Sequence, residues 1–130
     1  MHLHSVSFRY AETTILDRIS LTIRPGHHLA IVGSSGAGKT TLLRILLGLL
    51  KPDEGTVVIG EQDLSLTDLG TFYEAISFVS QDAPVFEGTL RENLVEGRVV
   101  PDDDVWAALE TTQLRSHIEK LGLGLETRTG

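Results

Sequence analysis

Gly33-Ser34-Ser35-Gly36-Ala37-Gly38-Lys39-Thr40 fits the phosphate-binding loop pattern G-x-x-x-x-G-K-[ST], with an additional glycine at Gly36. The segment before this loop, residues 28–32, is short, apolar and bounded by Pro25-Gly26, which predicts a buried strand. The segment after it, residues 40–47, is rich in strong helix formers. Strand, glycine loop and helix form the context that this pattern requires.

The residue types in the loop explain why it would bind phosphate. Glycines allow positive φ and a close approach of the backbone to a ligand, and the loop amides then converge with the positive end of the helix dipole. Lys39 can reach the β- and γ-phosphates, and Thr40 can offer its hydroxyl to Mg²⁺. The alternative is a glycine-rich turn before a core helix, with an incidental Lys-Thr pair. The expected nucleotide contacts are Gly33, Ser34, Ser35, Gly36, Ala37, Gly38, Lys39, Thr40 and Thr41.

Composition limits the classes of function. The chain has 130 residues, enough for one domain with a core, and a net charge of -7, which argues against a nucleic-acid backbone as partner. It has 0 cysteines, which excludes disulfides, thiolate metal sites and a cysteine nucleophile and fits a cytosolic setting. The longest apolar run, residues 45–50, is far shorter than the roughly 20 residues of a membrane span. The first residues lack a basic and apolar leader, so we expect no secretion signal.

Two alternating segments precede the loop. Residues 3–10 place Val6, Phe8 and Tyr10 on one face, and residues 18–24 alternate in the same way, so we expect an antiparallel pair of strands. Tyr10 lies where a turn begins and has two interpretations. It either covers the end of the hairpin or stacks on a base, an interaction worth about 1–3 kcal/mol.

His27 and His28 follow Pro25-Gly26. Adjacent residues in a strand face opposite ways and cannot chelate one ion together, so we interpret both as solvated turn histidines.

Past the loop, the helix is expected to continue to about Leu50 and to end at the turn of residues 51–55. A strand at residues 56–60 and a short helix at residues 68–74 follow. Residues 76–80 read as another strand, with Gln81 just past its carboxyl end, where ligands collect in open α/β sheets. Gln81 can therefore reach a metal or its water, or it is an ordinary polar loop residue.

The sequence of the last third of the chain indicates helices. Thr89-Leu90-Arg91-Glu92 has the spacing of a capping box, so a short helix carrying Asn93 and Leu94 should begin at Thr89. Asp102-Asp103-Asp104 should begin a longer helix, with its acids at the positive end of the helix dipole. We expect this helix to end at Gly122 and Trp106 to lie outside its buried face. Residues 123–130 read as a glycine-rich loop.

Together these segments resemble the ATP-binding subunit or domain of ABC transporters, over residues 3–130. Val6-Ser7-Phe8-Arg9-Tyr10 is similar to the first strand of the family, and residues 33–40 to its Walker A loop. Phe78-Val79-Ser80-Gln81-Asp82 is similar to the Q-loop, and residues 85–94 to the exporter branch. The resemblance implies that Tyr10 stacks on adenine and that Gln81 touches the Mg²⁺ and water site and moves with a transmembrane partner.

The resemblance also implies a fold and a setting. We expect an α/β fold, an incomplete P-loop NTPase (RecA-like) core, with an antiparallel β region at residues 1–30, the core to the Q-loop at residues 31–82 and the start of a helical subdomain at residues 83–130. ATP and Mg²⁺ are the implied cofactors. Lys39 and Gln81 would be catalytic, and Thr40 and Gln81 would hold the metal. The implied partners are transmembrane domains and a second nucleotide-binding domain, at the cytoplasmic face of the cell membrane.

Several motifs of the family are not among these residues: the signature loop, the Walker B strand with its catalytic Glu, the D-loop and the switch His. Residues 125–130 resemble the approach to the signature, so we expect a fragment that binds ATP without hydrolysing it and that is marginally stable or self-associates. Two alternatives remain. One is a stand-alone, non-catalytic nucleotide-binding or interaction module, and the other is a P-loop kinase with Arg91 or Arg98 as lid arginines.

Overall fold

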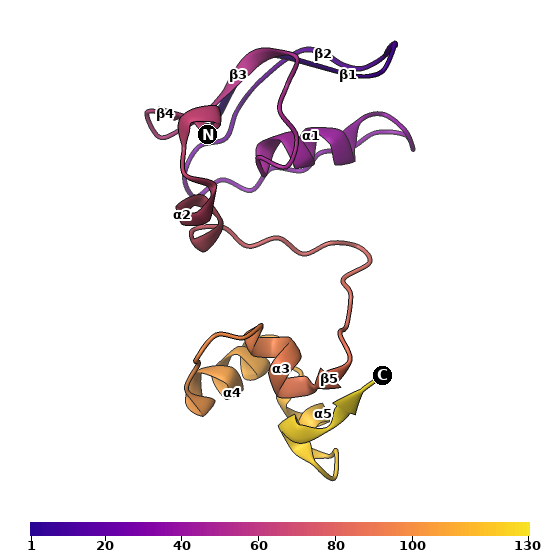
Figure 1. The fold of residues 1–130 in the computed structure, drawn as a ribbon, viewed down its shortest axis with the longest axis vertical. Helices are drawn as coiled ribbons and strands as arrows, with labels where there is room; N and C mark the ends of the chain where they lie inside the picture. Colours follow the sequence, from indigo (N-terminus) through magenta and orange to yellow (C-terminus); the bar gives the residue numbers. More distant parts are fainter. The chain divides into compact units, whose positions relative to one another are not determined.

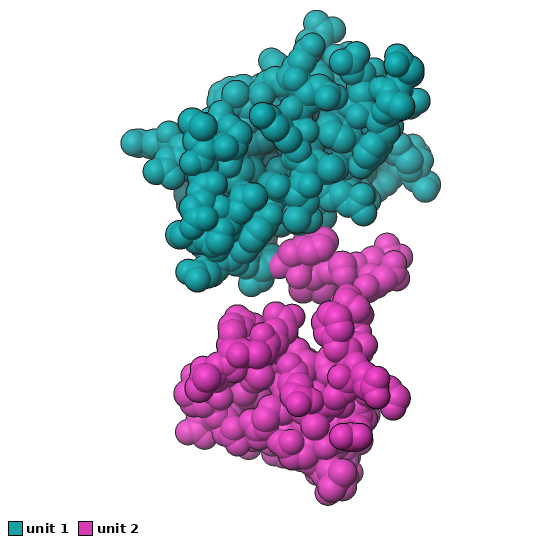
Figure 2. Space-filling model, viewed as in Figure 1, with its two compact units in different colours: residues 1–77 teal, residues 78–130 magenta.

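The computed structural model describes residues 1–130, which divide into two compact units, residues 1–77 and residues 78–130 (Figure 1, Figure 2). The first unit contains an antiparallel sheet and the glycine loop. The second contains three short helices and a two-stranded ribbon. Each unit has its own cluster of buried apolar side chains.

The sheet of the first unit is built around its N-terminal strand. β1 (His2–Tyr10) pairs antiparallel with β2 (Thr13–Thr22), which confirms the predicted pairing of the first two segments. β3 (Glu54–Ile59) pairs with the other side of β1, and β4 (Gln62–Asp63) pairs with β3, so the strand order is β2-β1-β3-β4. β2 begins earlier than the predicted residue 18.

The alternation predicted for the first strand is only partly right. Register shifts interrupt the pairing of β1 with β2, and Ser5 has φ 46 at one of them. The irregularity brings Leu3 as well as Val6 and Phe8 into the core, whereas Tyr10 at the end of the strand is 45% exposed. Bulges of this kind change which residues face the core, and the alternation of polar and apolar residues does not reveal them.

The helix after the glycine loop, α1 (Lys39–Leu46), packs against this sheet through Leu42, Ile45 and Leu46. It ends well before the predicted residue 50. Gly48 takes φ 70, and its N–H donates to the carbonyl oxygen of Ile45 at 3.0 Å. Glycine in the left-handed conformation is a common helix terminator because it satisfies the last carbonyls without steric cost. The core contains Leu3, Val6, Phe8, Leu16, Leu42, Ile45, Leu46, Val57, Leu64 and Phe72.

Two short helices complete the first unit. Asp63 accepts a hydrogen bond from the N–H of Ser65 and begins the 3₁₀ turn η1 (Leu64–Leu66). Asp68 accepts from the N–H groups of Gly70 and Thr71 and begins α2 (Leu69–Glu74), which confirms the predicted short helix. Both starts follow from aspartate as a helix N-cap.

Two strand predictions are wrong. Residues 28–32 and 76–80 contain no strand, and no segment of residues 1–130 pairs with either of them. A strand exists through hydrogen bonds to a neighbouring strand, so the apolar pattern alone does not produce one. Val32 and Val79 are 87% and 86% exposed, so the burial that this pattern predicted does not occur.

The second unit is organised around α3 (Leu90–Val95), whose predicted capping box is present. The N–H of Glu92 donates to Thr89 Oγ1 at 3.1 Å, and the N–H of Thr89 donates to Glu92 Oε2 at 2.7 Å. The other helices are α4 (Asp102–Thr111), α5 (Arg115–Glu119) and the 3₁₀ turn η2 (Gly124–Glu126). The core of the unit contains Val105, Leu109, Ile118 and Leu125.

The predicted long helix from residue 102 to residue 121 is divided in two. Gln113 adopts φ 60, and the N–H of Leu114 donates to the carbonyl oxygen of Leu109 at 2.8 Å, which closes α4. The turn lets Ile118 on α5 join the same core as Leu109. Trp106 is half-buried at the edge of that core, with the Arg115 guanidinium 5.6 Å from its ring.

The prediction of a loop at residues 123–130 is also wrong. β6 (Arg128–Thr129) pairs antiparallel with β5 (Gly88–Thr89), and the N–H of Leu90 donates to the carbonyl oxygen of Thr127 at 2.9 Å. These contacts join residues about forty positions apart, and no local pattern encodes them.

Arg91 links three elements of the second unit. Its guanidinium donates to both carboxylate oxygens of Asp102, at 2.6 and 3.2 Å, and to Glu126 Oε1 at 2.7 Å. The hydrogen bonds from Arg91, reinforced by its positive charge, lower the pKa of Asp102 from its usual value. The two carboxylates therefore connect α4 and η2 to α3 through one side chain.

Gly55 should be the glycine of the first unit that is least tolerant of alanine. Gly55 has φ 85, and a Cβ there would lie 2.4 Å from the carbonyl oxygen of His4. Gly60 has φ 62 with nothing within 4 Å, so it is the matched control. Gly60→Ala should cost about 1–2 kcal/mol for its conformation, and Gly55→Ala about 1–3 kcal/mol more for the clash. Urea unfolding followed by circular dichroism measures both, and equal losses would contradict the structure.

The stability of the second unit should depend on Asp102 near neutral pH and should lose this dependence in acid. The pKa of Asp102 is lowered in the folded chain, so its contribution is present above the unfolded-state pKa of about 3.9 and is lost as the pH falls through the folded-state value. The Asp102→Asn variant should thus be less stable than the parent at pH 6, and the difference should shrink toward zero in strong acid. Urea unfolding followed by the fluorescence of Trp106 measures it. Asp103→Asn, without an ion pair, should show no such difference.

Candidate nucleotide-binding site

The glycine loop packs against the sheet through its last glycine. Gly36 and Gly38 take φ 80 and φ 85, as a loop whose amides turn inward requires. A Cβ at Gly38 would lie 3.0 Å from Leu16 Cδ2 and 3.1 Å from the carbonyl oxygen of Ile15. Glycine is needed here for its conformation and for the close approach to β2.

The start of α1 offers donors without a competing acceptor. Gly38 is the N-cap and supplies no side-chain hydrogen bond, and no acidic residue lies in the first turn. The first helical bond runs from the N–H of Leu42 to the carbonyl oxygen of Gly38 at 2.8 Å. The N–H of Ala37 donates to the carbonyl oxygen of Ser34 at 3.3 Å, and the amides from Gly38 to Thr41 keep their capacity to bind an anion at the positive end of the helix.

Lys39 folds back over the loop. Its Nζ donates to the carbonyl oxygens of Gly33 at 2.9 Å and Ser34 at 2.6 Å. The ammonium group therefore stands at the mouth of the loop, bound to two carbonyls that phosphate oxygens can replace. The structure thus places the Lys39 ammonium group against the first two residues of the loop, and phosphate binding by residues 33–40 stays a prediction.

The two threonines after Lys39 differ. Thr40 is exposed, so its hydroxyl is free to face a ligand or a cation. Thr41 is 8% exposed and lies on the core side of α1, so only its backbone N–H can contribute to a nucleotide site. Thr40 thus fits the role of metal ligand that its place in the motif suggests, because a hard cation such as Mg²⁺ prefers oxygen ligands.

Tyr10 ends β1, and its ring packs edge-on against Phe8 with centroids 4.9 Å apart. Figure 1 shows the β1–β2 turn and the loop that precedes α1 on the same side of this unit, at the right of the view. The partial exposure of Tyr10 leaves ring surface available to a ligand. Stacking of this ring on a base stays a prediction.

Gln81 belongs to the second unit, residues 78–130, and lies in an exposed turn instead of at the end of a strand. Its participation in the site of the first unit therefore stays a prediction too.

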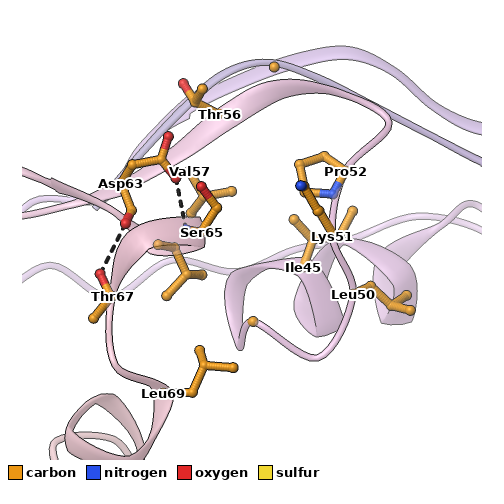
Figure 3. Close-up of a pocket in the computed structure, with 13 residues that line it drawn as sticks. Ile45, Leu50, Lys51, Pro52, Thr56, Val57, Asp63, Ser65, Thr67 and Leu69 are labelled. Atoms are coloured by element: carbon orange, nitrogen blue, oxygen red, sulfur yellow. Dashed lines mark hydrogen bonds between the residues drawn. The ribbon is translucent and has the colours of Figure 1, made fainter.

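A pocket of about 300 Å³ lies at the opposite end of α1 from the loop (Figure 3). Side chains of α1, β3 and η1 line it, with apolar walls and the polar groups of Lys51, Asp63 and Thr67 among them. Asp63 accepts hydrogen bonds from Ser65, which lower its pKa. None of residues 33–40 lines this pocket, so it is separate from the predicted phosphate-binding loop. No sequence pattern predicts the pocket, because three separate stretches of the chain form it, residues 45–52, 55–57 and 63–69.

Comparison with known proteins gives the family. A family model described as ABC transporter matches residues 16–128. Mycobactin import ATP-binding/permease protein IrtB of Mycolicibacterium thermoresistibile is 39% identical over 96% of this chain and 22% of its own length. Iron-sulfur clusters transporter ATM1 of Saccharomyces cerevisiae is 37% identical over 97% of this chain and 19% of its own. Colicin V secretion/processing ATP-binding protein CvaB of Escherichia coli is 34% identical over 100% and 19%.

The solved structure of a bacterial Atm1-family ABC exporter with ATP bound superposes with a TM-score of 0.93 and 32% identity, over 99% of this chain and 23% of that one. The chain thus spans less than a quarter of the length of these relatives. Its fold corresponds to the N-terminal part of their ATP-binding domain, an antiparallel β region followed by α/β elements. None of its own helices has the length and apolar character that a membrane crossing requires.

Proposed function

Because the chain belongs to the ABC transporter family, as part of an ATP-binding domain of the exporter type, we propose that it binds MgATP at residues 33–40. The observation that carries the proposal is the position of Lys39, whose ammonium group closes a loop of left-handed glycines at an uncapped helix start. A loop of this geometry has converging donors for a polyphosphate and little to offer a neutral ligand.

The residues of the proposed site would have different roles. The amides of Gly36 to Lys39 hold phosphate oxygens, Lys39 neutralises the terminal phosphates, and Tyr10 stacks on the base. Thr40 and Gln81 would hold the metal, which in such sites neutralises charge on the β- and γ-phosphates. The division of the chain at residues 1–30, 31–82 and 83–130 belongs to the same proposal.

We further propose that the isolated chain turns ATP over at a rate near background. Phosphoryl transfer needs the γ-phosphate, the metal and an oriented water in one arrangement. Residues 1–130 supply the phosphate side, and the carboxylate motif that would orient the water is not among them. A steady ATPase rate that requires Lys39 would contradict this part of the proposal.

The activity proposed for the longer protein is ATP-driven transport across a membrane, with transmembrane domains and a second ATP-binding domain as partners at the cytoplasmic face. The name of IrtB joins an ATP-binding part to a permease, which supports the partnership. Export is the direction we propose, on the similarity to the Atm1-family exporter and to CvaB. The name of IrtB describes import, so this branch of the family is not uniform in direction.

The two alternatives are less well supported. Arg91, one of the two arginines that a kinase lid would use, is bound to Asp102 and Glu126 within the second unit. A stand-alone binding module would use the same loop and the same ligand, and it differs from our proposal only in having no transport partner.

Lys39→Ala should weaken MgATP binding by about tenfold or more, because hydrogen bonds to charged groups are worth about 1.5–3 kcal/mol. Isothermal titration calorimetry of the whole chain measures the affinity, and phosphate release from the same samples measures turnover. Lys51→Ala is the matched control, because Lys51 lies in the same unit at the far end of α1. Equal affinity in parent and Lys39→Ala would overturn the assignment of the loop.

Tyr10→Ala should weaken ATP binding by roughly fivefold to a hundredfold, since stacking on a base is worth about 1–3 kcal/mol. Inorganic triphosphate, which has no base, should bind the variant and the parent equally. Tyr73→Ala is the control, because Tyr73 is 42% exposed in the same unit, close to the 45% of Tyr10. A loss of triphosphate binding in Tyr10→Ala would show instead that the tyrosine supports the fold of the loop.

A further inference from the structure

One polar side chain of α3 connects the loop that contains Gln81 to the C-terminal strand. Asn93 Oδ1 accepts a hydrogen bond from the N–H of Phe86 at 2.7 Å. Its Nδ2 donates to the carbonyl oxygens of Phe86 and Thr89, both at 2.9 Å, and to Thr129 Oγ1 at 3.1 Å. The carboxamide of Asn93 therefore contacts residues 86–89, which precede α3, and the distant strand β6.

Thr129 completes the connection from the other side. Its hydroxyl donates to the carbonyl oxygen of Phe86 at 2.8 Å and lies 3.2 Å from that of Gly88. The carbonyl of Phe86 thus accepts from both Asn93 and Thr129. Both side chains are half-buried, so water competes with these bonds less than it does at an exposed site.

The backbone pairing alone is too short to hold the C-terminal strand. β5 and β6 have 2 residues each, and an isolated two-stranded pair is marginal in water even when it is longer. Arg91, two residues before Asn93 on α3, binds Glu126 at the start of the same returning segment. Two side chains of one helix therefore secure residues 126–129.

The loop before β5 has no comparable anchor. Among residues 78–87 the described hydrogen bonds all involve Phe86, and the segment contains no helix or strand. Phe86 is therefore the first residue after Gln81 whose backbone is held by hydrogen bonds, and Asn93 and Thr129 make them. Without them, the returning segment would be joined to residues 88–90 only by the short β5–β6 pairing and the backbone bond from Leu90 to Thr127.

We propose that Asn93 is a positioning residue that locks β6 to the end of the Gln81 loop, so that residues 86–89 and 127–130 open and move as one body. The locking does not depend on nucleotide.

Native-state hydrogen exchange on the whole 130-residue chain, without nucleotide, tests the proposal. In the parent, amides of residues 86–89 and 127–130 should exchange through a common opening. Asn93→Ala should speed exchange in both segments by about tenfold or more, because it removes four hydrogen bonds, while amides of α4 keep their rates. Thr129→Val should act in the same way and Thr129→Ser should retain the protection of the parent.

Asn93→Asp separates the two halves of the carboxamide. It keeps an oxygen for the N–H of Phe86 and removes the donors to Phe86, Thr89 and Thr129, so residues 127–130 should lose protection while the amide of Phe86 keeps most of its own. Thr111→Val is the matched control, because the hydroxyl of Thr111 bonds only to Ala107 of its own helix.

Unchanged exchange at residues 127–130 in Asn93→Ala would overturn the proposal, and so would an equal acceleration in Thr111→Val or in α4. Calorimetry with MgATP on the parent chain is a separate measurement. Failure to bind ATP would contradict the proposed function and leave the exchange result on Asn93 standing.

Discussion

The close approach of Gly38 to β2 is the constraint on which the rest of the first unit depends. Gly38 is at once the end of the glycine loop, the N-cap of α1 and a point of contact with Leu16 and Ile15. Because it has no side chain, the start of α1 can lie against the sheet, and Leu42 and Ile45 then reach the core. The packing that stabilises the unit and the amides that would bind phosphate are fixed by the same residue.

The second unit is held in a different way. Its apolar core is small, and side chains of α3 supply much of its connectivity through charged and polar contacts: Arg91 to α4 and η2, and Asn93 to the loop and β6. Hydrogen bonds of this kind are directional, so they set the position of a short strand more narrowly than apolar contacts would. The side chains proposed to bind phosphate belong to the first unit, and Gln81 belongs to the second.

The two exposed apolar segments show that an apolar pattern alone does not predict a strand. Residues 28–32 and 76–80 have the composition of buried strands, yet residues 1–130 supply no strand to pair with them. The hydrophobicity of a segment depends on that segment alone and shows only which side chains favour burial. A strand also needs hydrogen bonds to a second strand, and composition does not show whether one is present. The relatives that match this chain are more than four times as long.

By itself the sequence determined the features whose physics is local. The glycine loop, the N-cap of Asp68 and the capping box at Thr89 follow from backbone sterics and from hydrogen bonds that span a few residues. The pairing of β1 with β2 follows from two alternating segments joined by a short turn. Only the tertiary structure decided the place of β3 beside β1, the turn at Gln113, the return of β6 to β5 and the bonds of Asn93. These depend on residues far apart in the chain, whose meeting is set by the packing of the whole unit and not by any segment within it.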